Sequence, residues 1–266
     1  MTISQLTAPL NEHAQSLTKA RISRTPIAPL TETDPTLSID QAYQIQLLQI
    51  KERIAGGAQI RGYKVGLTSK AMQTQLGVSE PDFGHLTDDM FFFNDLEITT
   101  KQFIAPKVEP EVAFVMGQEL AGPGVTVAQA IRAVDFVLPA LEIIDSRIKK
   151  WKIKCVDTIA DNASSGGVVL GTKPTLLRHV DLVTETGSLA VGSNTDYVDS
   201  KPGTAVLGSP VNALVWLANA LGARDIAFQP GDVILSGAWT AAVEVRAGMS
   251  VWARFTSLGK AKAVFT

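Results

Sequence analysis

Acidic residues inside two apolar runs place the strongest constraint on how this chain can fold. Glu109 and Glu111 lie two positions apart in the run 106–116, and Glu142 lies in a second run, 136–145. Successive side chains of a strand point to opposite faces, so Glu109 and Glu111 share one face. The opposite face of the first run is apolar, as in a strand that covers a core. Carboxylates on such strands are costly to bury unless a positive group meets them.

The three glutamates allow two interpretations. Three carboxylates supply the hard oxygen ligands that Mg²⁺ or Mn²⁺ uses, with positions left open for water or substrate. Alternatively, Glu109 and Glu111 lie on a solvated strand face, and Glu142 pairs with a nearby arginine or lysine. Spacing alone favours the second interpretation.

Helical signals come first along the chain, and strand signals follow. Ser38 and Gln41 form a capping box that begins a helix, Gly56 and Gly57 end it, and an earlier helix is expected around 10–21. Two further helices are expected to begin at Thr126 and at Ser209, the second followed by proline and closed by Gly222. The predicted strands are 59–66, 108–116, 135–144, 166–171, 187–191, 232–236, 243–247, 251–256 and 261–265.

This pattern predicts one continuous α+β unit. A helical N-terminal segment, 1–57, precedes a β-rich catalytic domain, 58–266. A length of 266 residues also allows two small domains, but no linker-like stretch divides the chain.

Charge and cysteine content narrow the classes of partner. A net charge of −2 gives no general attraction to nucleic acid or to an anionic membrane. The basic stretch 147–154 is interpreted as a solvated loop or strand face. Cys155 is the only cysteine, no signal peptide is visible, and no apolar run approaches the ~20 residues that span a bilayer. A cytoplasmic protein is therefore expected.

Two segments in the first third of the chain contain residues that could take part in catalysis. Lys64 lies on a predicted strand, where it could be a proton donor facing a pocket or an ordinary strand lysine. The segment 79–86 is predicted to be a tight loop. Within it, Asp82 could present an acid to a site, and His85 is expected to be a surface or hydrogen-bonding residue.

Two small-residue segments later in the chain could approach a ligand. The segment 161–167 is a polar turn that enters a strand, and it could bind an anion or be a plain turn. The segment 236–240 ends an apolar strand in small residues, where the backbone could lie close to a bound molecule.

Nearly the whole chain resembles the hydratase/decarboxylase family of the fumarylacetoacetate hydrolase superfamily. The order and spacing of several motifs make the resemblance specific, and it favours the cation-site interpretation of the glutamates. The motifs are Lys64 to Thr68, Pro81 to Gly84, Glu109-x-Glu111, Leu138 to Arg147 and Ala160 to Ser164.

The resemblance implies a β-rich sandwich or roll of the fumarylacetoacetate hydrolase type. It implies that Glu109, Glu111 and Glu142 bind Mg²⁺ or Mn²⁺, and that Lys64 and Asp82 are catalytic. The substrate-binding residues that it implies are Leu67, Asp161, Asn162, Ser164 and Thr240. Pro110, between two of the glutamates, departs from the expected small or apolar residue and predicts an edge or bulged strand.

The activity implied is that of a lyase acting on 2-hydroxy-2,4-dienoates, or their 2-oxo tautomers, from meta-cleavage of aromatic compounds. The segments 81–86 and 151–158 resemble the hydratases, whereas 237–242 resembles the decarboxylases. We therefore expect hydration of 2-hydroxypenta-2,4-dienoate to 4-hydroxy-2-oxopentanoate.

Three alternatives stay open. They are decarboxylation of 4-oxalocrotonate (2-oxohex-3-enedioate), C–C bond hydrolysis of an acylpyruvate, and a non-catalytic subunit that stabilises a partner enzyme. The resemblance also implies a homo-oligomer, which could form a complex with the companion hydratase or decarboxylase of the pathway.

Overall fold

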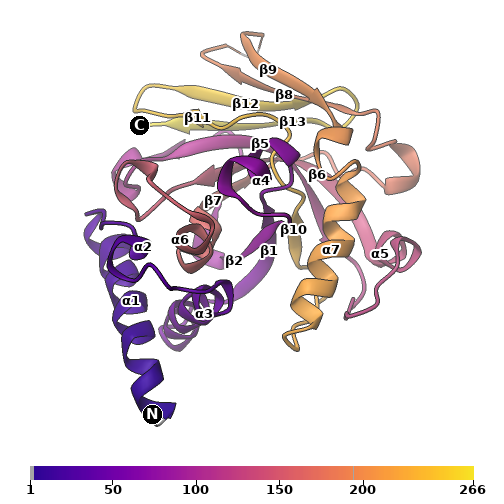
Figure 1. Cartoon of the computed structure of the whole chain (residues 1–266). Coiled ribbons are helices and arrows are strands. Elements are labelled where there is room, and N and C mark those ends of the chain that lie inside the picture. Colours follow the sequence, from indigo (N-terminus) through magenta and orange to yellow (C-terminus); the bar gives the residue numbers. More distant parts are fainter. Residues whose placement is uncertain (1–2, 194) are drawn as a thin grey trace.

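The chain forms a mixed α+β fold built around two β-sheets (Figure 1). The computed structural model describes residues 3–193 and 195–266. The helices are α1 (Ile3–Ser23), α2 (Leu30–Thr33), α3 (Ile39–Ala55), α4 (Lys70–Leu76), α5 (Val127–Ala133), α6 (Cys155–Ala160) and α7 (Pro210–Gly222). The fold class expected from the sequence is confirmed.

The larger sheet contains eight strands and provides the framework for the acidic residues. Its strands are β1 (Ile60–Gly66), β2 (Asp82–Thr87), β3 (Phe91–Phe92), β5 (Lys107–Met116), β6 (Val134–Ile144), β7 (Ser165–Leu170), β10 (Val233–Leu235) and β11 (Val243–Glu244). Their order is β2-β1-β10-β5-β6-β7-β3, and β11 also pairs with β5. The long antiparallel strands β5 and β6 therefore occupy the middle of this sheet.

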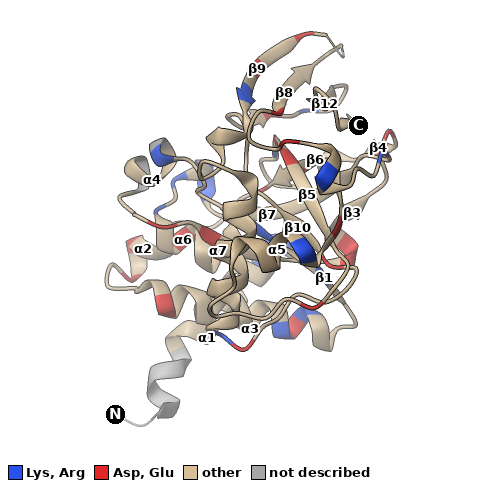
Figure 2. Ribbon diagram, turned by 90° about the vertical axis from the view of Figure 1, so that its right-hand side faces the viewer, with Lys and Arg blue, Asp and Glu red and all other residues tan. Residues whose placement is uncertain are grey.

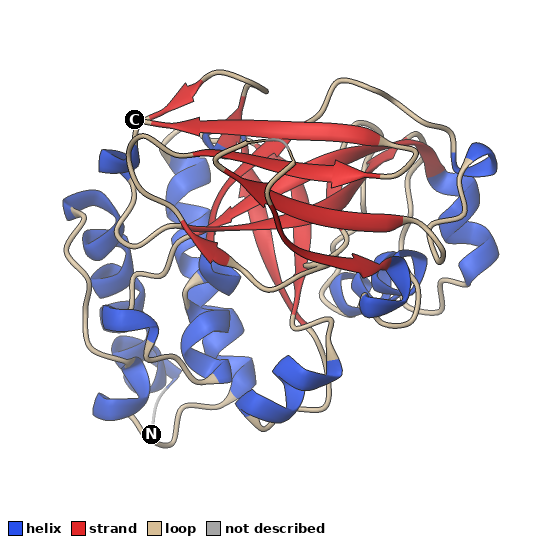
Figure 3. Cartoon of the chain, turned by 90° about the horizontal axis from the view of Figure 1, so that it is seen from above, coloured by secondary structure: helices blue, strands red, loops and turns tan. Residues whose placement is uncertain are grey.

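The smaller sheet has five strands in the order β4-β13-β12-β8-β9. They are β4 (Glu97–Ile98), β8 (Thr186–Val191), β9 (Tyr197–Pro202), β12 (Ser250–Phe255) and β13 (Gly259–Phe265). In Figure 1 this sheet lies at one end of the molecule, and α1 and α3 lie at the other. Figure 3 shows helices on both sides of the strands.

Side-chain caps begin the helices where the sequence predicted them. Gln41 N donates to Ser38 Oγ (3.2 Å), and Ser38 N donates to Gln41 Oε1 (2.9 Å), which completes the capping box of α3. Thr126 caps α5 in the same way, and Ser209 caps α7, which has proline at its first position. These three predicted helix starts are confirmed.

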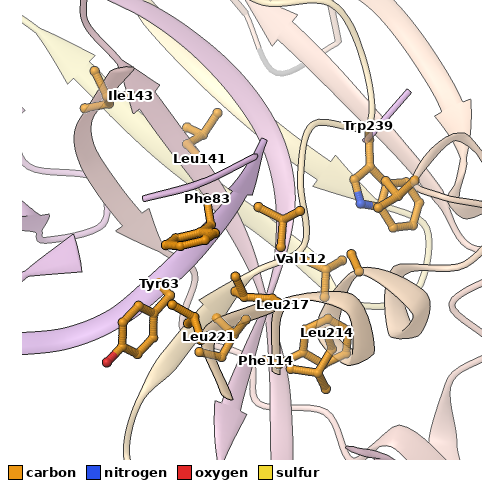
Figure 4. Packing of buried hydrophobic residues seen from close by; sticks show 14 of the residues in the cluster. Tyr63, Phe83, Val112, Phe114, Leu141, Ile143, Leu214, Leu217, Leu221 and Trp239 are labelled. Atoms are coloured by element: carbon orange, nitrogen blue, oxygen red, sulfur yellow. The ribbon is translucent and has the colours of Figure 1, made fainter. Parts of the chain in front are cut away.

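One face of β5 is part of the hydrophobic core. Val112 and Phe114 are fully buried near Leu214 and Leu217 of α7 (Figure 4). Burying each such side chain contributes about 1.5–3 kcal/mol. The alternating residues Glu109 and Glu111 therefore point to the opposite face of a strand that packing holds in place.

Among the residues that the structure describes, one helical stretch, Gly203–Gly222, is long and apolar enough to cross a membrane by length and composition alone. This corrects the expectation that no apolar run approaches that length. The stretch includes α7, in which Leu214, Leu217 and Leu221 are fully buried in the core. Those contacts are typical of a core helix.

Two local predictions in the larger sheet are wrong. The segment predicted as a tight loop at 79–86 contains most of β2, whose six residues are all buried.

The prediction of an edge or bulged strand at Pro110 is the second. Pro110 lies on β5, which is an interior strand, and it pairs with Leu141 in continuous register. Pro110 O accepts a hydrogen bond from Trp239 N (3.0 Å). The polar edge of Pro110 therefore faces the connection after β10, where its missing N–H breaks no bond with β6.

The basic stretch 147–154 is only partly solvated. Arg147 is 6% exposed and forms an ion pair with Asp161, so the expectation of a solvated segment is wrong at that residue. Lys107 Nζ lies over the ring of Trp151, 4.7 Å from its centre. Figure 2 shows lysines and arginines interspersed with aspartates and glutamates over the visible ribbon.

Candidate active site

The three glutamates converge on one point of the larger sheet. Glu109 and Glu142 are direct partners across the β5–β6 pair, and Glu111 is two residues further along the same face. Their closest carboxylate oxygens all lie within 4.8 Å of one another. Glu111 and Glu142 are fully buried and Glu109 is half-buried. A solvated strand face does not describe Glu111 or Glu142.

The environment of this cluster disfavours three negative charges. Glu111 Oε2 accepts a hydrogen bond from Gly237 N (2.7 Å). Glu111 Oε1 and both oxygens of Glu142 have no hydrogen-bond partner among the described residues. Burial and the neighbouring Glu142 raise the pKa of Glu109 to about 7, and they raise the pKa of Glu111 well above its ordinary value. Unpaired, mutually repelling carboxylate oxygens fit a divalent cation.

Lys64, on β1, supplies one positive charge beside the cluster. Its Nζ forms an ion pair with Glu142 Oε1 at 3.0 Å. The same Nζ donates a hydrogen bond to Ala163 O (2.8 Å). Burial alone would lower the pKa of Lys64, but neighbouring carboxylates, with Glu142 foremost, raise it above its ordinary value. Lys64 is therefore a buried ammonium held at two points.

Asp82 is a second buried acid near Lys64. It begins β2 opposite Gly66, and its Oδ1 has no hydrogen-bond partner in the described part of the chain. Burial, with a smaller contribution from the charge of Glu142, raises the pKa of Asp82 to about 6. The nearby Lys64 ammonium acts in the opposite direction but does not outweigh burial. A carboxyl group that titrates near neutral pH can both take up and release a proton.

The glycine at position 66 leaves room for that carboxyl group. A Cβ atom at Gly66 would lie 2.1 Å from Asp82 Oδ1. The glycine between Val65 and Leu67 therefore allows Asp82 to lie against the end of β1.

A strained turn lies against Lys64. Asn162, Ala163 and Ser164 have φ values of 54°, 50° and 54°. The left-handed region costs a residue other than glycine about 1–2 kcal/mol, so three in succession need support from their surroundings. Arg147 supports both ends of the turn, because its Nη1 donates to Ser165 O (2.9 Å) and its Nη2 donates to Asp161 O (2.5 Å).

Three predicted substrate-binding side chains are engaged inside the protein. Both carboxylate oxygens of Asp161 accept hydrogen bonds, from Arg147 Nε and from Arg147 N and Ser146 Oγ. The amide of Asn162 bonds to the backbone of His85, and Ser164 Oγ lies 3.2 Å from Thr158 Oγ1. Contact between these side chains and a substrate stays a prediction.

The other two predicted substrate-binding residues lie in loops that follow strands of the larger sheet. Leu67 follows β1, is half-buried, and has a φ of 57°. Thr240 follows β10 and is 7% exposed, and its hydroxyl makes only a long contact with Ala241 O (3.4 Å). Among the polar side chains predicted to bind substrate, the Thr240 hydroxyl therefore has the weakest hydrogen bond within the described part of the protein.

His85 and Gln46 form a buried polar pair that the sequence did not reveal. His85 was expected to be a surface or hydrogen-bonding residue; it is 1% exposed, and its Nδ1 lies 3.0 Å from Gln46 Oε1, so the hydrogen-bonding alternative is confirmed and the surface alternative is wrong. Gln46 Nε2 donates to Phe83 O (3.0 Å) and to Ile159 O (2.8 Å). Burial lowers the pKa of His85 to about 4, so the ring is neutral. The available sequence signal was a glutamine on the apolar face of α3.

A cleft outside the acidic cluster lies on a different face of β2. It has a volume of about 820 Å³, and its lining includes Tyr43, Phe83, Trp216 and Arg224. The Arg224 guanidinium lies over the ring of Tyr43, 4.5 Å from its centre. The cleft is lined by neither Lys64 nor the glutamates, so it is separate from the acidic cluster.

Buried, converging carboxylates beside a lysine could bind a divalent cation, an arrangement typical of cation-dependent enzymes. A family model described as Fumarylacetoacetate (FAA) hydrolase C-terminal matches residues 61–266, and the chain belongs to this family.

Two relatives are similar to this chain over most of its length. A 2-keto-4-pentenoate hydratase of Paraburkholderia xenovorans (strain LB400) is 43% identical over 254 residues, covering 96% of this chain and 94% of the relative. A 2-hydroxyhexa-2,4-dienoate hydratase of Comamonas testosteroni is 41% identical over 241 residues, covering 90% of each.

A solved structure shares the whole fold. 4-Oxalocrotonate decarboxylase from Pseudomonas putida G7, complexed with magnesium and adipate, superposes with a TM-score of 0.92 at 33% identity. The match covers 100% of this chain and 99% of that chain. The resemblance inferred from the sequence motifs is confirmed at the level of the family.

Proposed function

We propose that this protein is a metal-dependent hydratase, a lyase that adds water to 2-hydroxypenta-2,4-dienoate and gives 4-hydroxy-2-oxopentanoate. The observation that carries the proposal is the convergence of Glu109, Glu111 and Glu142 beside Lys64. Two relatives that are hydratases by name match 96% and 90% of this chain at 43% and 41% identity, which supports hydration over other chemistry.

Mg²⁺ or Mn²⁺ is the proposed cofactor, held by the three glutamates. When bound there, it would supply Lewis-acid stabilisation of negative charge on the oxygen at C2 of the substrate. Hard carboxylate ligands and the absence of any cysteine or histidine in this cluster support the choice of metal.

Lys64 and Asp82 are the proposed proton-transfer residues. The dienol loses the proton of its 2-hydroxyl group and gains one at C5, which gives a conjugated 2-oxo-3-enoate. Water then adds across this double bond, with hydroxyl at C4 and a proton at C3. Asp82, with a pKa of about 6, is suited to exchange protons near neutral pH, and the Lys64 ammonium is suited to donate one.

Substrate carboxylate binding is assigned to the 161–164 turn and to Thr240, with Leu67 as a neighbouring wall. The Thr240 hydroxyl is the side-chain donor best suited to this role, because the polar groups of Asp161 and Asn162 have partners inside the protein. Contacts from Asp161, Asn162 and Ser164 would accordingly come from the backbone of the turn.

Decarboxylation of 4-oxalocrotonate is the second candidate, and the superposition on the decarboxylase structure favours it. The test is to supply purified protein and Mg²⁺ with each substrate and to compare kcat/KM for water addition and for CO₂ release. The proposal expects a higher kcat/KM for water addition. Faster release of CO₂ from the six-carbon diacid would replace the hydratase assignment with the decarboxylase.

A homo-oligomer in the cytoplasm is the proposed state of the protein, with association to a companion decarboxylase or hydratase as an extension. Exposed apolar side chains support self-association, notably Phe93 (79% exposed), Leu96 (56%) and Tyr197 (52%). Tyr197 lies on β9, an edge strand of the smaller sheet. Sedimentation of the purified chain would measure the subunit count, and a monomer would contradict the oligomer.

A further inference from the structure

Asn162 fastens the strained turn to β2. Its Oδ1 accepts a hydrogen bond from His85 N (2.8 Å), and its Nδ2 donates to His85 O (2.9 Å). The side chain therefore satisfies both polar backbone groups of one residue, as a neighbouring strand would. Asn162 is 7% exposed, so these bonds form largely out of water.

The next residue of the turn restrains the lysine. Lys64 Nζ donates to Ala163 O (2.8 Å), and the same atom lies 3.0 Å from Glu142 Oε1. The position of the Ala163 carbonyl thus determines one of these two contacts of the ammonium group. A shift of the turn relative to β2 would move that contact.

The sequence of β2 is adapted to this close approach. Gly84 pairs with Lys64 across the β1–β2 ladder. A Cβ atom at Gly84 would lie 2.5 Å from Asn162 O and 2.8 Å from Ser165 Oγ. The turn therefore packs directly on the strand beside Lys64.

We infer that the side chain of Asn162 is a positioning group for proton transfer, acting through Ala163 O on Lys64 and not by its own contact with substrate. The inference rests on the proposed hydratase function. It gives the Asn162 side chain a role other than the substrate binding that the family resemblance implied for this residue. Loss of the two hydrogen bonds between the Asn162 side chain and the His85 backbone should slow the chemical step and leave substrate binding nearly unchanged.

The test compares variants that separate backbone conformation from the amide clamp. Asn162→Gly keeps access to the left-handed backbone but removes both hydrogen bonds. Asn162→Asp keeps the acceptor for His85 N and loses the donor to His85 O. This second variant provides the test if Asn162→Gly does not fold.

Asn219→Ala is the matched control for these variants. Asn219 Oδ1 accepts from Val125 N (2.7 Å) and its Nδ2 donates to Val125 O (3.2 Å), which is the same two-bond clamp on another part of the chain. The control should lower Tm and leave kcat and KM at their wild-type values.

For Asn162→Gly, kcat should fall by about 10- to 100-fold, the range expected when a reacting group is misplaced. KM and the affinity for Mn²⁺ should stay within about threefold of the wild type, because the backbone groups proposed to bind the substrate carboxylate and the three glutamates are all retained. In the Lys64→Ala background, Asn162→Gly should lower kcat by less than about threefold, because the residue through which it acts is gone.

Either of two results would overturn the inference. One is a wild-type kcat in Asn162→Gly, and the other is an additional loss in the Lys64→Ala background as large as in the wild type. A rise in KM without a fall in kcat would instead restore direct substrate binding by Asn162.

Failure of the proposed function would look different. In that case the wild-type protein itself would not add water to the dienoate. A crystal structure of Asn162→Gly would then still decide the inference, which requires that Lys64 Nζ no longer lies within hydrogen-bond distance of Ala163 O.

Discussion

Lys64 shows at the residue scale how burial and charge act together. An isolated buried lysine would tend to lose its proton, but four carboxyl groups around Lys64 keep it charged. In turn, the ammonium stabilises Glu142, whose oxygens otherwise lack partners among the described residues. The sequence showed that these residues were unusual in their strands. It could not show that Lys64 meets Glu142, because that contact depends on the order of strands in the sheet.

Lys64→Ala should lower kcat by about 10²- to 10⁴-fold, because a positioned proton-transfer group contributes that much. The far-ultraviolet circular dichroism should match the wild type, since the sheet does not depend on this side chain. The control is Lys152→Ala, because Lys152 pairs with Glu32 at the surface with its side chain 74% exposed. A Lys64→Ala variant with normal kcat would show that Lys64 is an ordinary strand lysine.

His85 gives a stability prediction that depends on pH. Its folded pKa of about 4 lies below the ordinary 6.5, so between these values the unfolded chain binds a proton that the folded protein does not. The contribution of neutral His85 to stability is therefore complete above about pH 6.5 and is lost as the pH falls towards 4.

Thermal unfolding of metal-free wild type and His85→Gln measures this contribution. The raised pKa values of Asp82, Asp161 and Glu109 act in the opposite direction, but they are common to both proteins. The difference in Tm between the two proteins should shrink from pH 7.5 to pH 5. A constant difference would mean that His85 is not buried in its neutral form.

At the scale of elements, β2 and the 162–164 turn show where sequence-based prediction stopped. The nine predicted strand segments each contain an observed strand, since apolar runs between turn residues are a local signal. The sequence of β2, Asp-Phe-Gly-His-Leu-Thr, lacks that signal because its polar residues are satisfied by partners distant in sequence, such as Gln46 and Asn162. The left-handed turn was predicted only as a turn for the same reason.

Gly84→Ala should separate the turn from β2. The added methyl group would lie 2.5 Å from Asn162 O, a backbone atom that three left-handed residues and Arg147 hold in place. Overpacking of this kind costs about 1–3 kcal/mol, so Tm should fall. The displaced Ala163 carbonyl should also lower kcat.

Gly56→Ala is the control for that variant. Gly56 ends α3 with a φ of −79°, and its added Cβ would lie 3.3 Å from the nearest atom, Arg53 O. This variant should keep the wild-type kcat. Equal kcat in Gly84→Ala and Gly56→Ala would contradict the role of the turn.

At the scale of the whole molecule, the fold brings distant segments to one place. Lys64 and Asp82 come from β1 and β2, the glutamates from β5 and β6, and Gly237 from the loop after β10. Neighbouring strands such as β1 and β10 are far apart in the chain, so no local pattern could predict the arrangement. The family resemblance supplied the expected convergence of the glutamates, and the register of β5 with β6 supplies its physical basis.

Removal of the metal should affect the whole protein. Treatment with a chelator should abolish hydration, and added Mg²⁺ or Mn²⁺ should restore it. Cation binding to the folded state alone should also raise Tm with increasing cation concentration. Glu111→Gln should lose most of that increase, and full turnover by metal-stripped wild type would refute the metal mechanism.

The central claim is that Glu109, Glu111 and Glu142 bind one divalent cation. Anomalous diffraction from crystals grown with Mn²⁺ tests it most directly, because the signal locates the ion independently of activity. We predict one peak among the three carboxylates and, in crystals with Mg²⁺, metal–oxygen distances of about 2.0–2.1 Å. The absence of a peak there, or a peak bound only by other residues, would contradict the account.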